Sequence, residues 1–300
     1  MHRHMFGFGL ALLVVVVLAC VPVHGARNDF DGDGSTDLVL WHAATGNWYL
    51  LQSTDGFELL QFGSASTIPV PADYDGDGET DLAVYYPPWG MWYILGSTVG
   101  FYQVPFGWSE ATPVPGDYDN DGTADFGLYH QAAGYWYGLL STEGFQHKPF
   151  GWSEAIPVPA DYDGDNKKDI AVWHPASGNW YLDQTTDGFE TFQFGWAAAR
   201  PIPGDFDGDG ADDPGLFHQA SGTWYGLLST DGFQTMTFGG AATLGLAGDF
   251  NGDGTSDAGL YHPGAGTWHF MLSPGGTYAE EAFGWSAVHP VGYRYQGEGD

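Results

Sequence analysis

Cysteine and basic residues are scarce in this chain. Cys20 is the only cysteine among 300 residues, so the chain cannot form an internal disulfide. Lys and Arg together number 7 against 38 Asp and Glu, which gives a formal net charge of −31. Nucleic acid is therefore not expected as a partner, because no basic patch can replace the counterions of its phosphates.

Long apolar runs are almost as scarce. The run from Leu10 to Val23 follows a weakly basic start, and this order is typical of a signal peptide. Cleavage after Gly25 would remove the first 25 residues and release residues 26–300 as a secreted protein without a membrane span. Pro22 disfavours an uncleaved anchor, and lipid attachment at Cys20 is an alternative that would keep the protein on a cell surface.

The acidic residues are concentrated in a nine-residue pattern that occurs six times. From Asp73 to Asp81 it has aspartates at positions 1, 3, 5 and 9 and glycines at positions 4 and 6. Carboxylates so close together repel one another unless a cation lies between them, and Ca²⁺ takes about six to eight oxygen ligands at flexible angles. Glycine permits the sharp turn that brings the odd positions to one centre. We predict that each loop binds one Ca²⁺ through these four side chains and the backbone carbonyl at position 7.

The predicted metal-binding positions 1, 3, 5, 7 and 9 are occupied in the six loops by Asp29, Asp31, Asp33, Ser35 and Asp37; Asp73, Asp75, Asp77, Glu79 and Asp81; Asp117, Asp119, Asp121, Thr123 and Asp125; Asp161, Asp163, Asp165, Lys167 and Asp169; Asp205, Asp207, Asp209, Ala211 and Asp213; and Asp249, Asn251, Asp253, Thr255 and Asp257. A secreted protein without disulfides needs another source of stability. We expect up to six Ca²⁺ ions to supply it in a structural role.

The loops belong to a longer internal repeat. They start at Asp29, Asp73, Asp117, Asp161, Asp205 and Asp249, each 44 residues after the last. Two aromatic series keep the same step: Trp48, Trp92, Trp136, Trp180, Trp224 and Trp268, and Phe62, Phe106, Phe150, Phe194 and Phe238, with Phe283 after a one-residue insertion. A period of about 40–45 residues suits one propeller blade of four strands, so we predict a single all-β domain with six blades.

This repeat resembles a known family. The pattern D-x-D-G-D-G-x-x-D followed by an apolar strand is similar to the FG-GAP/VCBS repeat of integrin-α-like β-propellers. The fourth repeat shows the pattern most completely, from Ile156 to Asp165 and from Ile170 to Tyr181, and is similar to the repeats of VCBS proteins secreted by bacteria. Asn166 departs from it, since glycine is usual there. The resemblance implies a propeller fold with Ca²⁺ sites, and such propellers serve as adhesins, lectins and accessory domains of enzymes.

One blade can be followed strand by strand in residues 111–152. We expect strands at 112–115, 126–129, 135–140 and 145–150, joined by tight turns. Because the first loop follows the predicted cleavage point almost at once, blade one lacks its inner strand. The segment from about Val288 to Tyr295 matches that strand in spacing and should complete the blade, without a loop, since Arg294 and Gln296 replace its acids.

The blade end opposite the loops carries a second repeated set. It consists of His42, His130, His174, His218 and His262, with Tyr86 in blade two, and of Trp108, Trp152, Trp196 and Trp285 where one blade crosses to the next. In one interpretation these residues form equivalent shallow pockets that stack sugar rings and bind their hydroxyls. In the other, which we favour, they pack blade against blade, with each His satisfied by a backbone carbonyl.

The sequence favours a binding module over an enzyme. A single active site should interrupt the repeat, and the interruptions, such as Tyr86–Trp89 and the glycine-rich stretch Gly239–Gly248, gather no nucleophile, base and orienting acid at a recognisable spacing. We expect adhesion, with glycans or cell-surface proteins as partners and multivalent glycan binding as its sharpest form. The alternatives are a polysaccharide-acting hydrolase or lyase with one site in the central funnel, and a structural surface or filament protein.

Overall fold

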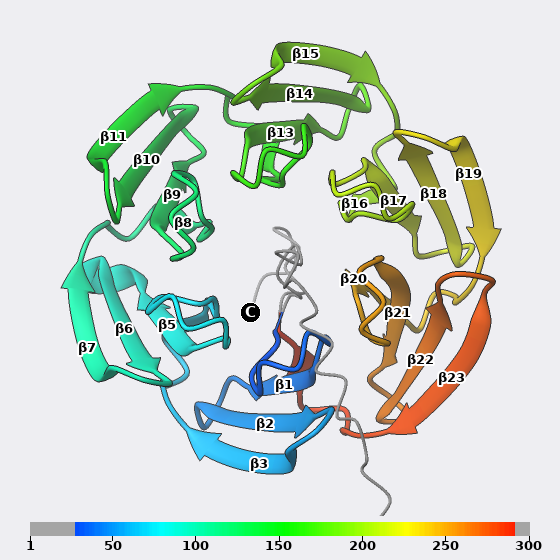
Figure 1. Ribbon diagram of the computed structural model, residues 1–300, viewed down its shortest axis with the longest axis horizontal. Coiled ribbons are helices and arrows are strands. Elements are labelled where there is room, and N and C mark those ends of the chain that lie inside the picture. Colours follow the sequence, from blue (N-terminus) through cyan, green and yellow to red (C-terminus); the bar gives the residue numbers. More distant parts are fainter. Residues whose placement is uncertain (1–27, 292–300) are drawn as a thin grey trace, which may run out of the picture.

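The computed structural model describes residues 28–291, which form six four-stranded antiparallel sheets set as blades around a central axis (Figure 1). The prediction of an all-β, six-bladed propeller is confirmed. Within this range the helical structure is one short 3-10 turn, η1 (Pro87–Trp89). No helix among the described residues has the length and apolar character needed to cross a membrane.

Each blade runs from a short inner strand to an exposed outer one. Blade one contains β24 (His289–Pro290), β1 (Leu38–His42), β2 (Asn47–Gln52) and β3 (Gly56–Gln61). Blade two contains β4 (Ile68–Pro69), β5 (Leu82–Tyr86), β6 (Met91–Gly96) and β7 (Gly100–Pro105). Blade three contains β8 (Thr112–Pro113), β9 (Phe126–His130), β10 (Tyr135–Leu140) and β11 (Gly144–Pro149).

The other three blades repeat this order. Blade four contains β12 (Ile156–Pro157), β13 (Ile170–His174), β14 (Asn179–Gln184) and β15 (Gly188–Gln193). Blade five contains β16 (Arg200–Pro201), β17 (Gly215–His218), β18 (Thr223–Leu228) and β19 (Gly232–Thr237). Blade six contains β20 (Leu244–Gly248), β21 (Asp257–His262), β22 (Thr267–Leu272) and β23 (Thr277–Ala282).

The strands of blade three agree with the sequence pattern to within a residue or two. The inner strand β8 is the exception, because it pairs with β9 through only two residues where four were expected. Proline explains the short pairing: Pro113 and Pro115 have no N–H to donate to a ladder. The inner strands of blades one to five therefore hold the loops near the axis with few ladder bonds, whereas β20, which contains no proline, pairs with β21 through five residues.

The Trp48 series forms the core of the blades, as expected for aromatics that recur at the repeat step. These six indoles are at most 6% exposed. Each donates its Nε1–H to the backbone carbonyl of the Phe62 series, with N···O distances of 2.7–3.0 Å. The indole thus ties the third strand of a blade to the end of its outer strand while its ring is removed from water.

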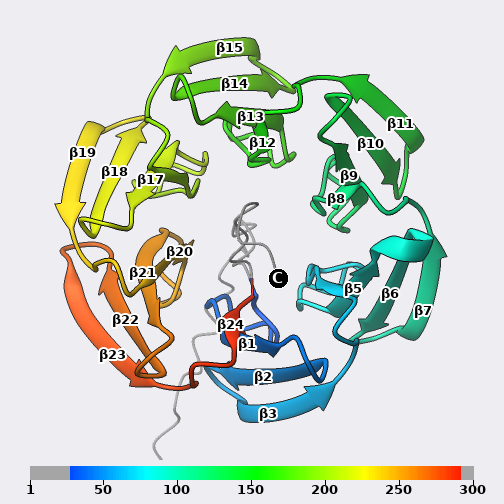
Figure 2. The ribbon, with the colours of Figure 1, turned by 180° about the vertical axis from the view of Figure 1, so that it is seen from behind.

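The ring closes inside blade one. Figure 2 shows β24 beside β1, where the two ends of the described chain meet. The register pairs Leu40 with Pro290 and Trp41 with His289, and the Val291 N–H donates to the Val39 carbonyl at 3.0 Å. The predicted closure is confirmed for this strand. The predicted signal peptide, with Cys20 and Gly25, lies outside the described residues, as do Arg294 and Gln296.

Candidate functional site

The acidic loops join the first and second strands of each blade and are linked to one another around the axis. In every loop the N–H at position 8 donates to the position 1 carbonyl of the neighbouring loop, over 2.5–2.7 Å. The pairs are Thr36–Asp249, Thr80–Asp29, Ala124–Asp73, Lys168–Asp117, Asp212–Asp161 and Ser256–Asp205. Six loops therefore form one closed ring of backbone hydrogen bonds.

The aspartate at position 1 folds the loop around its own carboxylate. In the second loop, Asp73 accepts the N–H groups of Gly76 at 2.7 Å and Gly78 at 2.9 Å. Both glycines have positive φ, 76° and 93°, which a side chain would strain. Asn166, the departure noted at position 6, has a φ of 68° and keeps the same bond to Asp161, because asparagine tolerates this conformation.

The aspartate at position 3 has one satisfied and one unsatisfied oxygen. The Oδ2 atom of Asp31 accepts the N–H groups of Thr54 at 2.9 Å and Asp55 at 3.0 Å, from the hairpin between the third and fourth strands. Its Oδ1 atom is buried without a hydrogen-bond partner. The same is true of Asp75, Asp119, Asp163 and Asp207. A buried carboxylate oxygen without a partner is costly, and a bound cation would remove that cost.

The aspartate at position 9 is the most deeply buried of the set, at most 2% exposed in all six loops. Asp37 accepts the N–H of Phe30 at 2.7 Å and that of Ser53 at 2.8 Å, so it ties the loop to the hairpin. Burial raises the pKa of Asp37, Asp169 and Asp213 to about 7 and the pKa of Asp81, Asp125 and Asp257 to about 6. A positive charge nearby would favour the ionised form of these carboxylates.

Position 5 behaves in the opposite way. Hydrogen bonds from the hydroxyls of Ser53 and Thr54 hold the pKa of Asp33 at about 2, so this carboxylate keeps its charge. Position 7 contributes its N–H to position 5, as Ser35 does to Asp33 at 2.8 Å. Its carbonyl remains a predicted ligand.

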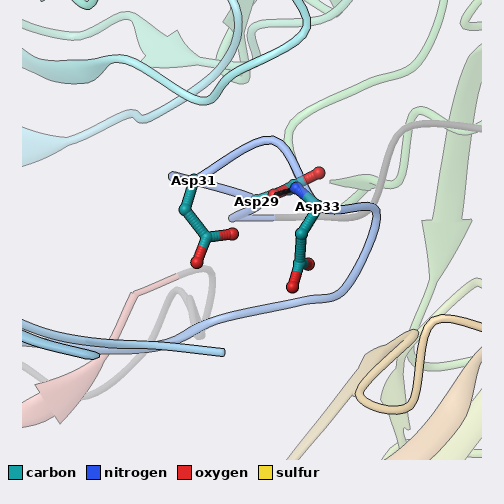
Figure 3. A group of neighbouring side chains, drawn as sticks. All are labelled: Asp29, Asp31 and Asp33. Carbon is teal, nitrogen blue, oxygen red and sulfur yellow. Dashed lines mark hydrogen bonds between the residues drawn. The ribbon is translucent and has the colours of Figure 1, made fainter. Parts of the chain in front are cut away.

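Five loops bring three aspartates to within 4.8 Å of one another. Figure 3 shows Asp29, Asp31 and Asp33 projecting from one loop. In the next four loops the group is formed by positions 1, 3 and 9: Asp73, Asp75 and Asp81; Asp117, Asp119 and Asp125; Asp161, Asp163 and Asp169; and Asp205, Asp207 and Asp213. Hard oxygen donors, the unsatisfied oxygens and the surplus of negative charge fit a divalent cation.

The sixth loop differs from this pattern at one position. Asn251 replaces aspartate at position 3, and its Nδ2 donates to Asp253 at 3.0 Å and to the Ser273 carbonyl at 2.7 Å. Pro274 takes the place of the threonine whose N–H binds Asp31 in blade one, and proline has no N–H. The hairpin thus lacks the N–H donor in the one loop that lacks the accepting carboxylate. Within residues 28–291 this loop forms no aspartate triad.

The tight turn between the third and fourth strands was expected from the sequence, but its hydrogen bonds to the acidic loop were missed. Its Ser-Thr or Thr-Thr pair supplies N–H and hydroxyl donors to the carboxylates at positions 3, 5 and 9. The pairs are Ser53-Thr54, Ser97-Thr98, Ser141-Thr142, Thr185-Thr186 and Ser229-Thr230. They recur at the 44-residue step, and this signal could have identified them.

Comparison with known proteins agrees with the loops and the fold. Residues 29–84, which include the first two loops, match the family profile of the FG-GAP-like repeat. Residues 29–84 match this repeat, and the six-bladed fold fits a propeller of FG-GAP-like repeats. No curated protein matches the sequence of this repeat propeller.

Solved structures are similar to the repeat propeller in fold, at low sequence identity. A streptogramin B lyase is 10% identical with a TM-score of 0.58, and the match covers 89% of this chain and 86% of the lyase. An Agrocybe aegerita lectin that recognises non-reducing terminal N-acetylglucosamine is 15% identical with a TM-score of 0.56, over 84% and 91% of the two chains. A Staphylococcus aureus virginiamycin B lyase is 8% identical with a TM-score of 0.53, over 87% and 89%.

The opposite end of the repeat propeller carries four similar aromatic groups. In each, a tryptophan of the crossover lies edge-on against the tyrosine of the third strand in the next blade, with ring centroids 4.7–5.1 Å apart. The histidine at the end of the second strand lies 5.3–6.3 Å from the same indole. The groups are Trp108, His130 and Tyr137; Trp152, His174 and Tyr181; Trp196, His218 and Tyr225; and Trp285, His42 and Tyr49.

These groups pack neighbouring blades together and also reach the surface. Three of the histidines contact hydroxyls rather than the expected carbonyls: Nδ1 of His42, His174 and His218 lies 2.7–2.8 Å from the Oγ atom of the Thr or Ser three residues later. Trp196 is 38% exposed and Trp285 is 41% exposed. His262 is the exception, since no tryptophan contacts it.

A further aromatic series, which was not anticipated, lies on the outer strands. Phe57, Phe101, Phe145, Phe189, Phe233 and Tyr278 are 53–61% exposed. Each ring packs edge-on against the Phe62 series of the neighbouring blade, with centroids 6.2–6.5 Å apart. They form a belt around the circumference.

Proposed function

We propose that this chain is a secreted, calcium-stabilised propeller that binds glycans at several equivalent blade junctions and catalyses no reaction. The observation that carries the proposal is the set of four Trp-His-Tyr groups, which repeat at the blade end opposite the loops. Trp196 and Trp285 offer exposed apolar rings, and the nearby histidines offer ring nitrogens. Sugar pockets combine apolar or aromatic surfaces with a few placed polar groups in this way.

The buried acidic residues support a binding role rather than catalysis. Within residues 28–291 the buried carboxylates all occupy loop positions 1 and 9. There they accept backbone N–H groups, which suits structural and metal-binding roles. The lectin that recognises N-acetylglucosamine has the same kind of fold, so this architecture is compatible with sugar recognition.

Calcium fits the loops better than other common cations. Mg²⁺ demands near-octahedral geometry and keeps several waters, whereas Ca²⁺ accepts many carboxylate and carbonyl oxygens at flexible angles. Asp31 would offer its buried Oδ1, and Asp29 and Asp33 lie within reach of the same centre. Bound Ca²⁺ would supply positive charge and rigidity to the ring of loops.

Several weak sites on one rigid scaffold gain avidity. Isolated aromatic sugar contacts are weak, but a polysaccharide or cell surface with repeated sugars can engage more than one junction at once. Losing one junction should therefore weaken binding to a multivalent glycan far more than binding to a single sugar.

A glycan array in the presence of Ca²⁺ tests the proposal. The variants Trp152→Ala and Trp196→Ala should reduce binding to a multivalent glycan by about tenfold or more each. Trp89→Ala removes an indole that is 71% exposed but lies outside the four groups, and should leave binding unchanged. A protein that binds no glycan, or that releases cleaved sugar products, would contradict the proposal.

A further inference from the structure

The six blade junctions allow a comparison within one molecule. At five of them an indole contacts the side chain at the end of the second strand, with ring centroids 5.2–6.3 Å apart. Four of these indoles come from the crossovers, and the fifth, Trp89 in η1, contacts Tyr86. All 13 tryptophans of the chain lie in the described residues, and none contacts His262. The junction between blades five and six is therefore the one at which no indole contacts the side chain that ends the second strand.

Gly240 stands at the crossover position that tryptophan holds at four junctions and Ser64 holds between blades one and two. The turn itself is unchanged, because the Thr243 N–H donates to the Gly240 carbonyl at 3.0 Å as the Ala155 N–H donates to Trp152 at 3.0 Å. The φ of Gly240 lies outside the left-handed region, and a Cβ added there meets no atom within 4 Å. The backbone does not require glycine here, so only the ring is missing.

An open pocket of about 570 Å³ occupies this junction. Its lining includes Gly239–Thr243 and the buried Leu260, with the rings of His262, His269 and Tyr278. Pockets for small ligands span about 300–1,000 Å³ and combine apolar surface with a few polar groups. The volume and the lining therefore suit a planar ring.

The wall residues also depart from the repeat, and they support one another. His269 replaces the tyrosine that contacts the crossover indole in other blades, and Tyr278 replaces phenylalanine in the outer belt. His269 Nδ1 lies 2.8 Å from the Tyr278 hydroxyl and Nε2 lies 3.0 Å from Thr267 Oγ1, while the Tyr278 hydroxyl donates to Glu280 at 2.7 Å. Both imidazole nitrogens are thus engaged, which fixes the wall without an indole.

We propose that this junction is a socket for an aromatic ring about the size of indole, supplied by a small molecule or by the tryptophan side chain of a peptide. The ligand's ring would take the place that a crossover tryptophan fills at four other junctions, between His262 and His269. An apolar vacancy left by a missing side chain can take up a ring of matching size. The socket is separate from the four Trp-His-Tyr groups and does not depend on glycan binding.

Binding of indole and of N-acetyl-L-tryptophanamide to the calcium-loaded chain, measured by calorimetry and by ligand-observed NMR, tests the socket. We expect one site per chain with a dissociation constant on the order of 1 mM or tighter. Gly240→Trp should fill the socket and weaken binding at least tenfold. Ser64→Trp places the same new side chain at the junction of blades one and two and should leave binding unchanged.

The proposal is supported if both probes bind at one site and Gly240→Trp abolishes that binding. If indole alone binds there, the socket takes small molecules rather than a peptide. If Gly240→Trp misfolds, Gly240→Leu provides a smaller plug whose folding circular dichroism can verify. Indole that does not bind at about 10 mM, or that binds equally well to the plugged and wild-type proteins, would overturn the proposal. The proposal would also be overturned if N-acetylglucosamine bound to the wild type and to Ser64→Trp but not to Gly240→Trp, since the socket would then hold a sugar.

Discussion

Loop six offers a direct test of how the metal loops work. The proposed change is Asn251→Asp together with Pro274→Thr. The first substitution restores the carboxylate at position 3, and the second restores the hairpin N–H that such a carboxylate accepts from Thr54 in blade one. Either change alone leaves the pair mismatched, so the single variants are the controls.

The size of the effect follows from binding linkage. With a dissociation constant of ~0.1 mM and 1 mM Ca²⁺, one added site stabilises the fold by about 1.4 kcal/mol. For a domain of this size that is a rise in Tm of roughly 3–6 °C. In the presence of a chelator the double variant should be less stable than the wild type, because the new carboxylate then repels those of Asp249, Asp253 and Asp257 with no cation between them.

Calorimetric titration with Ca²⁺ and thermal unfolding with and without EGTA measure both quantities. The wild type should fill five sites first, with loop six weaker, and the double variant should fill six. Six indistinguishable sites in the wild type would refute the role assigned to Asn251. So would a double variant whose Tm rises equally in Ca²⁺ and in EGTA.

Three further outcomes follow from the structure. The calcium-free protein should melt at a higher temperature at pH 5 than at pH 8. The pKa of Asp37 is raised to about 7 in the folded protein, so protonation of this carboxyl stabilises the fold at low pH, and that stability is lost as the pH rises through 7. Saturating Ca²⁺ should remove or reverse this trend. Trp92→Phe should cost about 1–3 kcal/mol in urea unfolding, since it takes the Nε1–H donor from the Phe106 carbonyl, whereas Phe189→Leu in the exposed belt should cost far less. Gly240→Trp should raise Tm relative to Ser64→Trp by filling the pocket, and an equal or lower Tm would contradict the match in shape.

The blades and loops could be predicted from the sequence because their signals repeat. A step of 44 residues is enough to locate the acidic loops, the buried Trp48 series and the strand that closes blade one. Each of these features is carried by residue types with a strong local meaning: aspartate and glycine in a turn, and tryptophan at the repeat step in a core.

The contacts that complete the sites could not be predicted in the same way. The donors to Asp31 are backbone N–H groups 23 and 24 residues away, and a backbone group leaves no trace in the sequence. The recurring Ser-Thr pairs mark the hairpin, and Pro274 gives a further hint, since it lacks the N–H that such a donor needs beside Asn251. The pocket at Gly240 was visible only as a glycine-rich interruption, because its meaning depends on which rings of the next blade face the missing side chain.

The closure of blade one has a mechanical consequence. β24 pairs with β1 through two residue pairs, whereas β2 and β3 pair through six. The Thr36–Asp249 hydrogen bond also crosses this seam. A force applied between residues 28 and 291 would act directly on these two residue pairs. The propeller should therefore open between β24 and β1 before any other blade unfolds. A cation in the loop at Asp29, which includes Thr36, would raise the force needed to open this seam.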